Sequence, residues 1–372
     1  MSKLNNLFCA GTMRTGGSLL SNLLSTHKDV IVMTDIVHFF RYIYKKYDPI
    51  KEDHQLYKLC AELSLRLKVR DNIYIKKELF LNEIKKKNAK TYSEVYHCIF
   101  NTFKKKIPKK KIVGEYANAE WKNIGNFLNF NKNNYSIHVI RDPRAMLSSW
   151  KKITFSKGYK YFNSVFNWID SADCYFKYSK QFNKKRYMLI KFEDMHKTPE
   201  NVSKKLCKFL NIKYDKNMTK VKKWKLLLKH RFNFINESAY NKQSKVYGFS
   251  VKRINKWQDH LKDWEINLIN YLCQKRLKKL GYEFSKIDKK LLKEGISILK
   301  KDPFLKKRYN EFVINNRGNS MSLNDPTNPK NWESRIYAGT KFMKSKEYPI
   351  YKKELAKINI DTKKIKQKKN YA

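Results

Sequence analysis

A glycine-containing loop near the start of the chain carries the groups needed to bind an anion. Residues 11–18 read Gly-Thr-Met-Arg-Thr-Gly-Gly-Ser, after a short apolar run and before leucines at helical spacing. In this setting the backbone N–H groups of the loop and the positive end of the helix dipole can face a phosphate or a sulfate. Arg14 adds a cation to the loop and Ser18 adds a hydroxyl. A plain glycine turn before a helix is the alternative for this segment alone.

This loop differs at one position from the pattern G-x-x-x-x-G-K-[ST], which binds nucleoside triphosphates. Both glycines and the terminal hydroxyl are present, but Gly17 stands where that pattern has lysine. Because the lysine reaches the terminal phosphates, its absence disfavours a P-loop kinase or nucleoside triphosphatase. A kinase-like nucleotide-binding protein stays as an alternative function.

A second candidate anion site follows the apolar run 135–140. The next residues are Arg141-Asp142-Pro143-Arg144, and Ser149 lies eight residues beyond Arg141. Asp142 is expected to cap a helix whose first turn holds Pro143. Arg141 then lies at the carboxyl end of a strand, where ligands bind in open α/β sheets. The alternative is a surface turn with an ion pair.

Short apolar runs separated by helical segments indicate the elements that position these two motifs. Helical spacing follows the first loop, a helix is expected from Thr198-Pro199, and a long helix is expected from about residue 259 to Gly281. The expected strands are residues 7–10, 30–33, 112–116, 135–140 and 187–192. Strands that alternate with helices predict an α/β fold with a central parallel sheet flanked by helices.

Two segments lie outside this alternating pattern. Residues 41–110 have helical character and many charges, so we expect a helical insertion that is mostly solvated. Residues 301–372 are polar and rich in lysine, and we expect them to extend a single α/β domain of residues 1–300 at its C-terminal side.

Taken together, the two motifs resemble the sulfotransferase family, whose donor is 3′-phosphoadenosine 5′-phosphosulfate (PAPS). Residues 139–150, VIRDPRAMLSSW, are similar to the bacterial and tyrosylprotein branches of that family. Two later segments match in the same order: residues 186–212 resemble the family's strand, Glu-Asp turn and helix, and residues 250–257 resemble its late loop. The four segments span residues 7 to about 284.

The resemblance implies a role for each matching residue. The family's 5′-phosphosulfate loop corresponds to Arg14, Thr15, Gly16, Gly17 and Ser18, with Arg14 in the place of the lysine of the cytosolic enzymes. The 3′-phosphate motif corresponds to Arg141 and Ser149, and Arg253 corresponds to the arginine of the late loop. Many relatives have Gly-Glu-Lys where this chain has Gly114-Glu115-Tyr116, so a lysine contact is missing here.

The same resemblance implies a P-loop-type parallel sheet and a reaction. A sulfuryl group would pass in line from PAPS to a hydroxyl or amine of an acceptor, and adenosine 3′,5′-bisphosphate (PAP) would be the product. Arg14 and the N–H groups of the loop would stabilise the developing charge, and no metal is expected. Residues 41–110 would lie on the acceptor side. They match no part of the family, so the acceptor cannot be identified from it. A carbohydrate or a small molecule is expected, and a lipid headgroup or a peptide tyrosine stays open.

An acceptor hydroxyl also needs a base, and residues 34–38 can supply one. In the tyrosylprotein branch a catalytic glutamate stands at about the position of Asp35, which makes Asp35 the first candidate. His38 is the second, because its unperturbed pKa is nearer neutrality. In the alternative, Asp35 caps a helix and His38 packs beside Phe39 and Phe40.

The composition sets limits on the partners. The chain has 372 residues, with 82 Lys and Arg against 33 Asp and Glu, for a net charge of +49. Hydrophobic residues make up 41% and aromatic residues 14%, which argues against a disordered polybasic chain. A coding bias toward AT-rich codons would produce such a charge without any function behind it, and a polyanion partner such as nucleic acid or an acidic glycan is the alternative. Because no recognition-helix, RNA-binding or zinc pattern is present, a nucleic-acid-binding basic protein is disfavoured.

Cysteine spacing and hydropathy bear on the compartment. The six cysteines lie far apart without paired spacing, which favours free thiols in a cytoplasmic chain. No apolar run approaches the ~20 residues of a membrane-spanning helix, and the N-terminus has no signal pattern. We therefore expect a cytoplasmic protein with a nucleotide donor and a hydroxyl-bearing acceptor as partners; the oligomeric state stays open.

Overall fold

The computed structural model describes residues 5–106, 110–152, 158–222, 224, 248–318 and 342–370. It contains a five-stranded sheet in the order β2-β3-β1-β4-β5. The strands are β1 (Asn5–Gly11), β2 (Val30–Thr34), β3 (Ile112–Asn118), β4 (Tyr135–Ile140) and β5 (Tyr187–Lys191). β1 pairs in parallel with β4, and β4 pairs in parallel with β5. The predicted α/β fold with a parallel sheet flanked by helices is confirmed.

The strands form where the sequence has short apolar runs, because both faces of the sheet are covered. All residues of β2 are buried, as are the first six of β3, a pattern typical of parallel sheets. The strands agree with the predicted runs to within two residues at each end, and the end of the fifth strand has an instructive difference. Phe192 was expected in the fifth strand but begins α9 (Phe192–Lys197), whose first turn contains two acidic residues that suit a helix N-terminus.

The chain divides into two compact units. Unit 1 comprises residues 1–6, 28–115 and 322–372, and unit 2 comprises residues 7–27 and 116–321. The helices of unit 1 are α2 (Phe39–Tyr42), α3 (Asp53–Asp71), α4 (Lys77–Lys86), α5 (Tyr92–Lys106) and α17 (Glu347–Asn370). The helical character predicted for residues 41–110 is thus confirmed by α3, α4 and α5.

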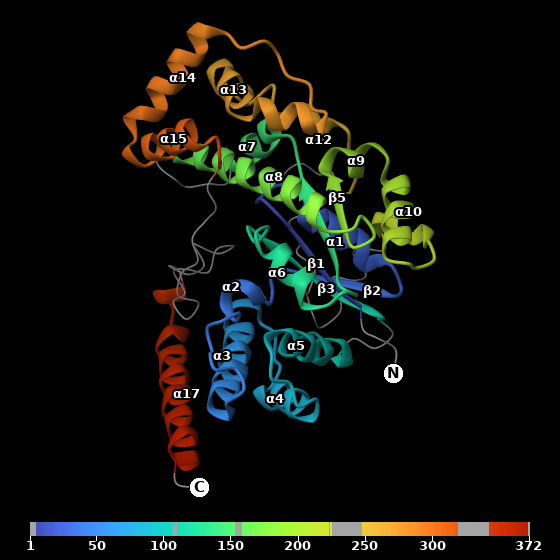
Figure 1. Ribbon diagram of the computed structural model, residues 1–372, viewed down its shortest axis with the longest axis vertical. Helices are drawn as coiled ribbons and strands as arrows, with labels where there is room; N and C mark the ends of the chain where they lie inside the picture. The colour runs from blue at the N-terminus through green and yellow to red at the C-terminus, as the bar shows by residue number, and fades with distance from the viewer. Residues whose placement is uncertain are drawn as a thin grey trace. The chain divides into compact units, whose positions relative to one another are not determined.

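Helices α3 and α17 lie side by side, although more than 270 residues separate them in the sequence (Figure 1). Their contact has an apolar centre formed by Ala61, Leu65, Tyr351 and Ile358. The Tyr57 hydroxyl donates a hydrogen bond of 3.0 Å to Asp361 at the edge. The expectation of a mostly solvated layer is wrong for α3. Helix α17 covers one face of α3, and on another face Arg66 and Arg70 are buried and donate hydrogen bonds to backbone carbonyls.

Unit 2 carries the remaining helices. They are α1 (Gly17–Thr26), α6 (Asn123–Phe130), α7 (Pro143–Lys151), α8 (Asn163–Gln181), α9, α10 (Pro199–Phe209), α12 (Lys252–Asn255), α13 (Asp263–Leu280), α14 (Lys289–Lys301) and α15 (Pro303–Asn315), with short 3-10 helices at Lys160–Phe162 and Lys216–Thr219. Helices α8, α13, α14 and α15 pack together (Figure 1). Leu305, Tyr309 and Phe312 of α15 are buried in this core.

The long helix of unit 2 ends where the sequence predicts and begins later. Gly281 follows α13 with φ 67°, the left-handed conformation that favours glycine. The helix starts at Asp263 instead of about residue 259, because Glu265 accepts a hydrogen bond of 2.7 Å from the backbone N–H of Lys262 and closes the first turn there.

Two further observations concern the cysteines and the hydropathy of the helices. All six cysteines are free thiols, as predicted. Among the helices of the described residues, none combines the length and the hydropathy that a membrane crossing requires.

Candidate active site

The anion-binding loop predicted at residues 11–18 connects β1 to α1 in a compact turn. The Thr15 hydroxyl is buried and donates a hydrogen bond of 2.6 Å to the carbonyl of Thr12. Gly16 precedes the helix with φ 99°, and Arg14 also has a positive φ, of 68°. Since non-glycine residues rarely adopt this conformation, Arg14 is held in an unusual backbone geometry. The N–H groups of the first turn of α1 have no partner within the helix.

Gly17 has a neighbour that explains why lysine is absent. A Cβ atom at Gly17 would lie 2.0 Å from the ring of Tyr116, which leaves no room for any side chain. The Tyr116 hydroxyl lies 3.4 Å from the Thr15 hydroxyl. Because Thr15 already donates to Thr12, Tyr116 donates to Thr15. The tyrosine ring therefore occupies the place beside the loop into which a lysine side chain at position 17 would have to grow.

The structure brings four of the predicted residues together in unit 2. The Arg14 Nε donates a hydrogen bond of 3.0 Å to the Ser149 hydroxyl, across 135 residues of sequence. Arg141 donates from one terminal nitrogen to the carbonyl of Arg14 at 3.2 Å and from the other to the carbonyl of Arg253 at 3.1 Å. The three motifs thus meet at one place, beside the N-terminus of α1.

The electrostatics of this cluster favour an anion. Burial lowers the pKa of Arg14 and of Arg253, and it lowers the pKa of Arg141 to about 10. Even so, all three guanidinium groups are charged at neutral pH. Among the described residues, no carboxylate lies within ion-pair distance of Arg14 or Arg141. The Arg141 guanidinium lies over the ring of Phe192 at 3.9 Å, and its Nε has no hydrogen-bond partner in the described part of the chain.

A network behind Arg141 fixes the end of β4. The Asp142 side chain caps α7 as predicted, accepting a hydrogen bond of 2.8 Å from the backbone N–H of Arg144. Asp142 also pairs with the Arg144 guanidinium at 2.6 Å, and that guanidinium lies over the ring of Trp257. Glu193 accepts hydrogen bonds of 2.9 Å from the backbone N–H of Asp142 and from the Tyr282 hydroxyl. These contacts hold Arg141 in place without using its guanidinium.

The two base candidates, Asp35 and His38, lie in unit 1, whereas the anion-binding residues lie in unit 2. Asp35 and His38 are both buried, with 3.4 Å between the Asp35 Oδ1 and the His38 Nε2. His38 is the N-cap of α2 and packs its ring against Tyr42. Burial lowers the pKa of His38 well below its usual value, and the positive charges of Arg70, Arg41 and Arg66 lower it further. The imidazole is therefore neutral at pH 7.

Glu115 is a residue that the sequence analysis missed as part of this site. It is fully buried and accepts a hydrogen bond from the backbone N–H of His38. Burial raises its pKa to about 7, against the opposing effects of that N–H group and of Arg66. A glutamate inside an apolar strand, in the sequence Val113-Gly114-Glu115-Tyr116, was the available signal, because a carboxylate there has to find a partner.

We predict that Glu115 makes the stability of the protein depend on pH. A carboxyl group whose pKa is raised on folding stabilises the folded state at low pH, and this contribution is lost as the pH rises through the folded pKa. With a shift from 4.5 to about 7, the free energy of unfolding of the wild type should fall relative to Glu115→Gln by about 2.5 kcal/mol between pH 5 and pH 8. Urea unfolding of both proteins at the two pH values measures this difference. If the free energies of unfolding of the wild type and of Glu115→Gln change equally with pH, the prediction is wrong.

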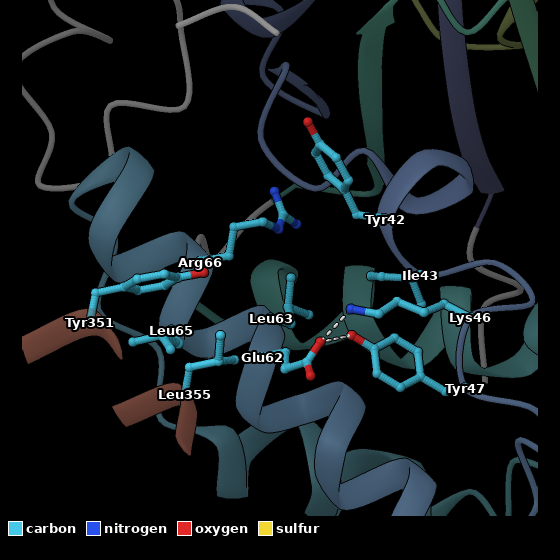
Figure 2. Close-up of a pocket in the computed structure, with 10 residues that line it drawn as sticks. All are labelled: Tyr42, Ile43, Lys46, Tyr47, Glu62, Leu63, Leu65, Arg66, Tyr351 and Leu355. Carbon is cyan, nitrogen blue, oxygen red and sulfur yellow. Dashed lines mark hydrogen bonds and ion pairs between the residues drawn. The ribbon is translucent and has the colours of Figure 1, made fainter. Parts of the chain in front are cut away.

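Unit 1 also contains a pocket between α3, α17 and the segment around α2 (Figure 2). Its lining is largely aromatic and aliphatic. It also contains an ion pair: the buried Glu62 accepts from the partly exposed Lys46 at 2.5 Å, and Glu62 accepts from the Tyr47 hydroxyl at 2.6 Å as well. Arg66 lies at the pocket wall, with its guanidinium 4.8 Å from the centre of the Tyr42 ring. Within the described residues, no group of three or more His, Cys, Asp or Glu side chains is arranged to hold a metal ion.

Known proteins include relatives of this chain. A model of the Sulfotransferase family matches residues 6–216, and no curated protein matches the sequence. Among the similar solved structures is the sulfotransferase domain of the olefin synthase of Synechococcus PCC 7002, with 13% identity, a TM-score of 0.49 and coverage of 77% of this chain and 98% of that chain. The sulfotransferase domain of the curacin biosynthetic pathway has 15% identity, a TM-score of 0.48 and coverage of 76% of this chain and 100% of that chain. Retinol dehydratase in complex with androsterone and PAP has 13% identity, a TM-score of 0.36 and coverage of 76% of this chain and 82% of that chain.

Proposed function

Because this chain belongs to the sulfotransferase family, we propose that it transfers the sulfuryl group of PAPS to a hydroxyl group of a carbohydrate or small-molecule acceptor. The observation that carries this proposal is the meeting of Arg14, Arg141 and Ser149 beside the N-terminus of α1. The donor carries a sulfate and two phosphates, and a cluster of buried and half-buried cations at a helix N-terminus is suited to such groups.

In this proposal each end of the donor has its own residues. Arg141, Ser149 and Arg253 bind the 3′-phosphate. Arg14, the backbone N–H groups of residues 15–18 and the Ser18 hydroxyl bind the 5′-phosphosulfate. The acceptor oxygen attacks sulfur while the bond from sulfur to the bridging oxygen breaks, and PAP leaves. Arg14 stabilises the negative charge that grows on the bridging and equatorial oxygens.

The proton of the acceptor hydroxyl passes to the pair formed by Asp35 and His38. Asp35 is the first candidate for the accepting group. His38 is the second, and the lowering of its pKa by burial keeps its imidazole unprotonated at neutral pH. The two groups are close enough, at 3.4 Å, to act as a pair.

A binding measurement distinguishes this function from that of a P-loop kinase. We expect PAP to raise the melting temperature, with a stabilisation of about 2.7 kcal/mol at a hundredfold excess over its Kd. ATP with Mg²⁺ should have little effect, because Tyr116 fills the space beside Gly17 that a phosphate-binding lysine needs. Duplex DNA serves as a polyanion control. Stabilisation by ATP with Mg²⁺ alone would contradict the proposal, and transfer from radiolabelled PAPS to a panel of hydroxyl acceptors tests the reaction directly.

A further inference from the structure

Residues 35–38, which carry the two base candidates, have an unusual backbone. Asp35 has φ 56° and His38 has φ 50°. Both values lie in the left-handed region, which is uncommon and strained for residues other than glycine. A four-residue segment that begins and ends in this region persists only where its surroundings hold it.

Two arginines of α3 hold the carbonyl groups of this segment. Arg66 donates to the carbonyl of Ile36 at 3.0 Å and to that of Val37 at 2.5 Å. Arg70 donates from one terminal nitrogen to the carbonyls of Asp35 and of Ile36, the latter at 3.0 Å. Three consecutive carbonyl oxygens thus have arginine donors.

The positions of these arginines on α3 allow both to contact residues 35–38. Arg66 and Arg70 are one helical turn apart on the same face, and they are 6% and 2% exposed. The Arg66 guanidinium, 4.8 Å from the centre of the Tyr42 ring, points toward Tyr42 (Figure 2). The Nε of Arg70 donates to the Asp71 carboxylate at 3.0 Å, which orients its guanidinium. The planar fork of arginine can reach two carbonyls at once, whereas a lysine ammonium cannot span them in the same geometry.

Glu115 of β3 holds the same segment from a different element. Its Oε1 accepts from the backbone N–H of His38, the residue at which the left-handed conformation recurs. Buried charges are costly unless they are paired. In this case the partners of Arg66, Arg70 and Glu115 all include the backbone of one four-residue segment. An ordinary buried ion pair joins two side chains and does not need the backbone of one particular segment as a partner.

We propose that Arg66, Arg70 and Glu115 are positioning residues that clamp residues 35–38 in the conformation in which Asp35 and His38 accept the proton of the acceptor. This inference rests on the proposed sulfuryl transfer, since it assigns a purpose to the shape of the segment in that reaction. The three residues act through the backbone and need not touch donor or acceptor.

The test compares Arg70→Lys with a matched control. We expect Arg70→Lys to lower kcat for transfer from radiolabelled PAPS to methyl glucoside, an alcohol whose proton a base has to remove, by about tenfold to a hundredfold, the effect of misplacing a catalytic group by about 1 Å. The Kd for PAP should change less than about twofold, because the proposed donor-binding residues are intact. The control is Tyr47→Phe, which removes the hydrogen bond from the Tyr47 hydroxyl to Glu62. Glu62 lies one turn before Arg66 on α3, so the control disturbs the same helix and should leave kcat unchanged.

Two further readouts separate positioning from a general loss of structure. In an Asp35→Asn background, Arg70→Lys should lower kcat little further, because the carboxylate that the clamp positions is already absent. Backbone amide exchange at His38 should be faster in Arg70→Lys and in Glu115→Ala than in the wild type, whereas Glu115→Gln, which keeps the accepting oxygen, should preserve slow exchange. This readout does not depend on turnover.

The outcomes distinguish the two proposals. A wild-type chain that binds PAP but transfers no label to methyl glucoside or to any other acceptor of the panel contradicts the proposed function. If the wild type is active and Arg70→Lys keeps its kcat, the clamp is wrong, whether or not His38 exchanges faster. The clamp is also contradicted if Arg70→Lys lowers kcat in the Asp35→Asn background by the same factor as in the wild type.

Discussion

Replacing Arg14 with alanine is expected to lower the rate constant for sulfuryl transfer by about 10²–10³-fold, the usual effect of removing one donor to a developing oxyanion. Arg14 lies in the loop between β1 and α1, and in our proposal it faces the oxygens on which charge grows. The loss should appear mainly in kcat, because the interaction is stronger in the transition state than with bound PAPS. Single-turnover transfer from saturating radiolabelled PAPS measures it.

The companion variant is Arg141→Ala, which removes a proposed contact to the 3′-phosphate. Because that phosphate does not react, Arg141→Ala should raise the KM for PAPS more than it lowers kcat. Arg186→Ala is the matched control in the same unit, since Arg186 also donates to a backbone carbonyl, that of Asn131 at 2.7 Å, but has no proposed role in the site. Wild-type kcat in Arg14→Ala, or the same loss in Arg186→Ala, would rule out the assignment of Arg14.

The second large effect is expected at the base. Asp35→Asn should lower kcat by about 10²–10⁴-fold, the range for loss of general-base catalysis, and His38→Ala should have the smaller effect. If the neutral imidazole of His38 takes part, the acidic limb of the pH–rate profile lies well below pH 6.5, because burial lowers the His38 pKa. That limb is lost in His38→Ala and kept in Asp35→Asn.

The control for the base prediction is His54→Ala. His54 is a buried histidine of the same unit, with its Nδ1 3.1 Å from a Glu52 carboxylate oxygen. It resembles the pair of His38 and Asp35 in chemistry but lies outside residues 35–38. Wild-type turnover in both Asp35→Asn and His38→Ala would exclude these residues as the base.

Local features of this protein could be predicted because they depend on neighbouring residues. The Asp142 cap followed by Pro143 and the glycine that ends α13 each act within one turn of helix. The same holds for the apolar runs that become β2 and β4, since burial on both faces needs only a continuous apolar stretch. Motif order then placed Arg14 and Arg141 at the carboxyl ends of their strands.

Contacts between distant segments could not be predicted in this way. Tyr116 was recognised only as a departure from Gly-Glu-Lys, whereas its ring lies against Gly17, 99 positions earlier. The arginines of α3 were taken for part of a charged, solvated surface. Charge alone does not distinguish a solvated arginine from one that is buried against backbone carbonyls, since only the topology brings residues 35–38 to that face of the helix.

The packing of α17 on α3 has a consequence for the order of synthesis. Helix α3 leaves the ribosome early, but the face formed by Ala61 and Leu65 gains its cover only when Tyr351 and Ile358 have been made. At translation rates of about 5–20 residues per second, this delay is on the order of tens of seconds. During that time an apolar strip stays exposed on the helix that carries Arg66 and Arg70. A nascent chain or fragment that stops before residue 347 is therefore expected to bind chaperones at this strip.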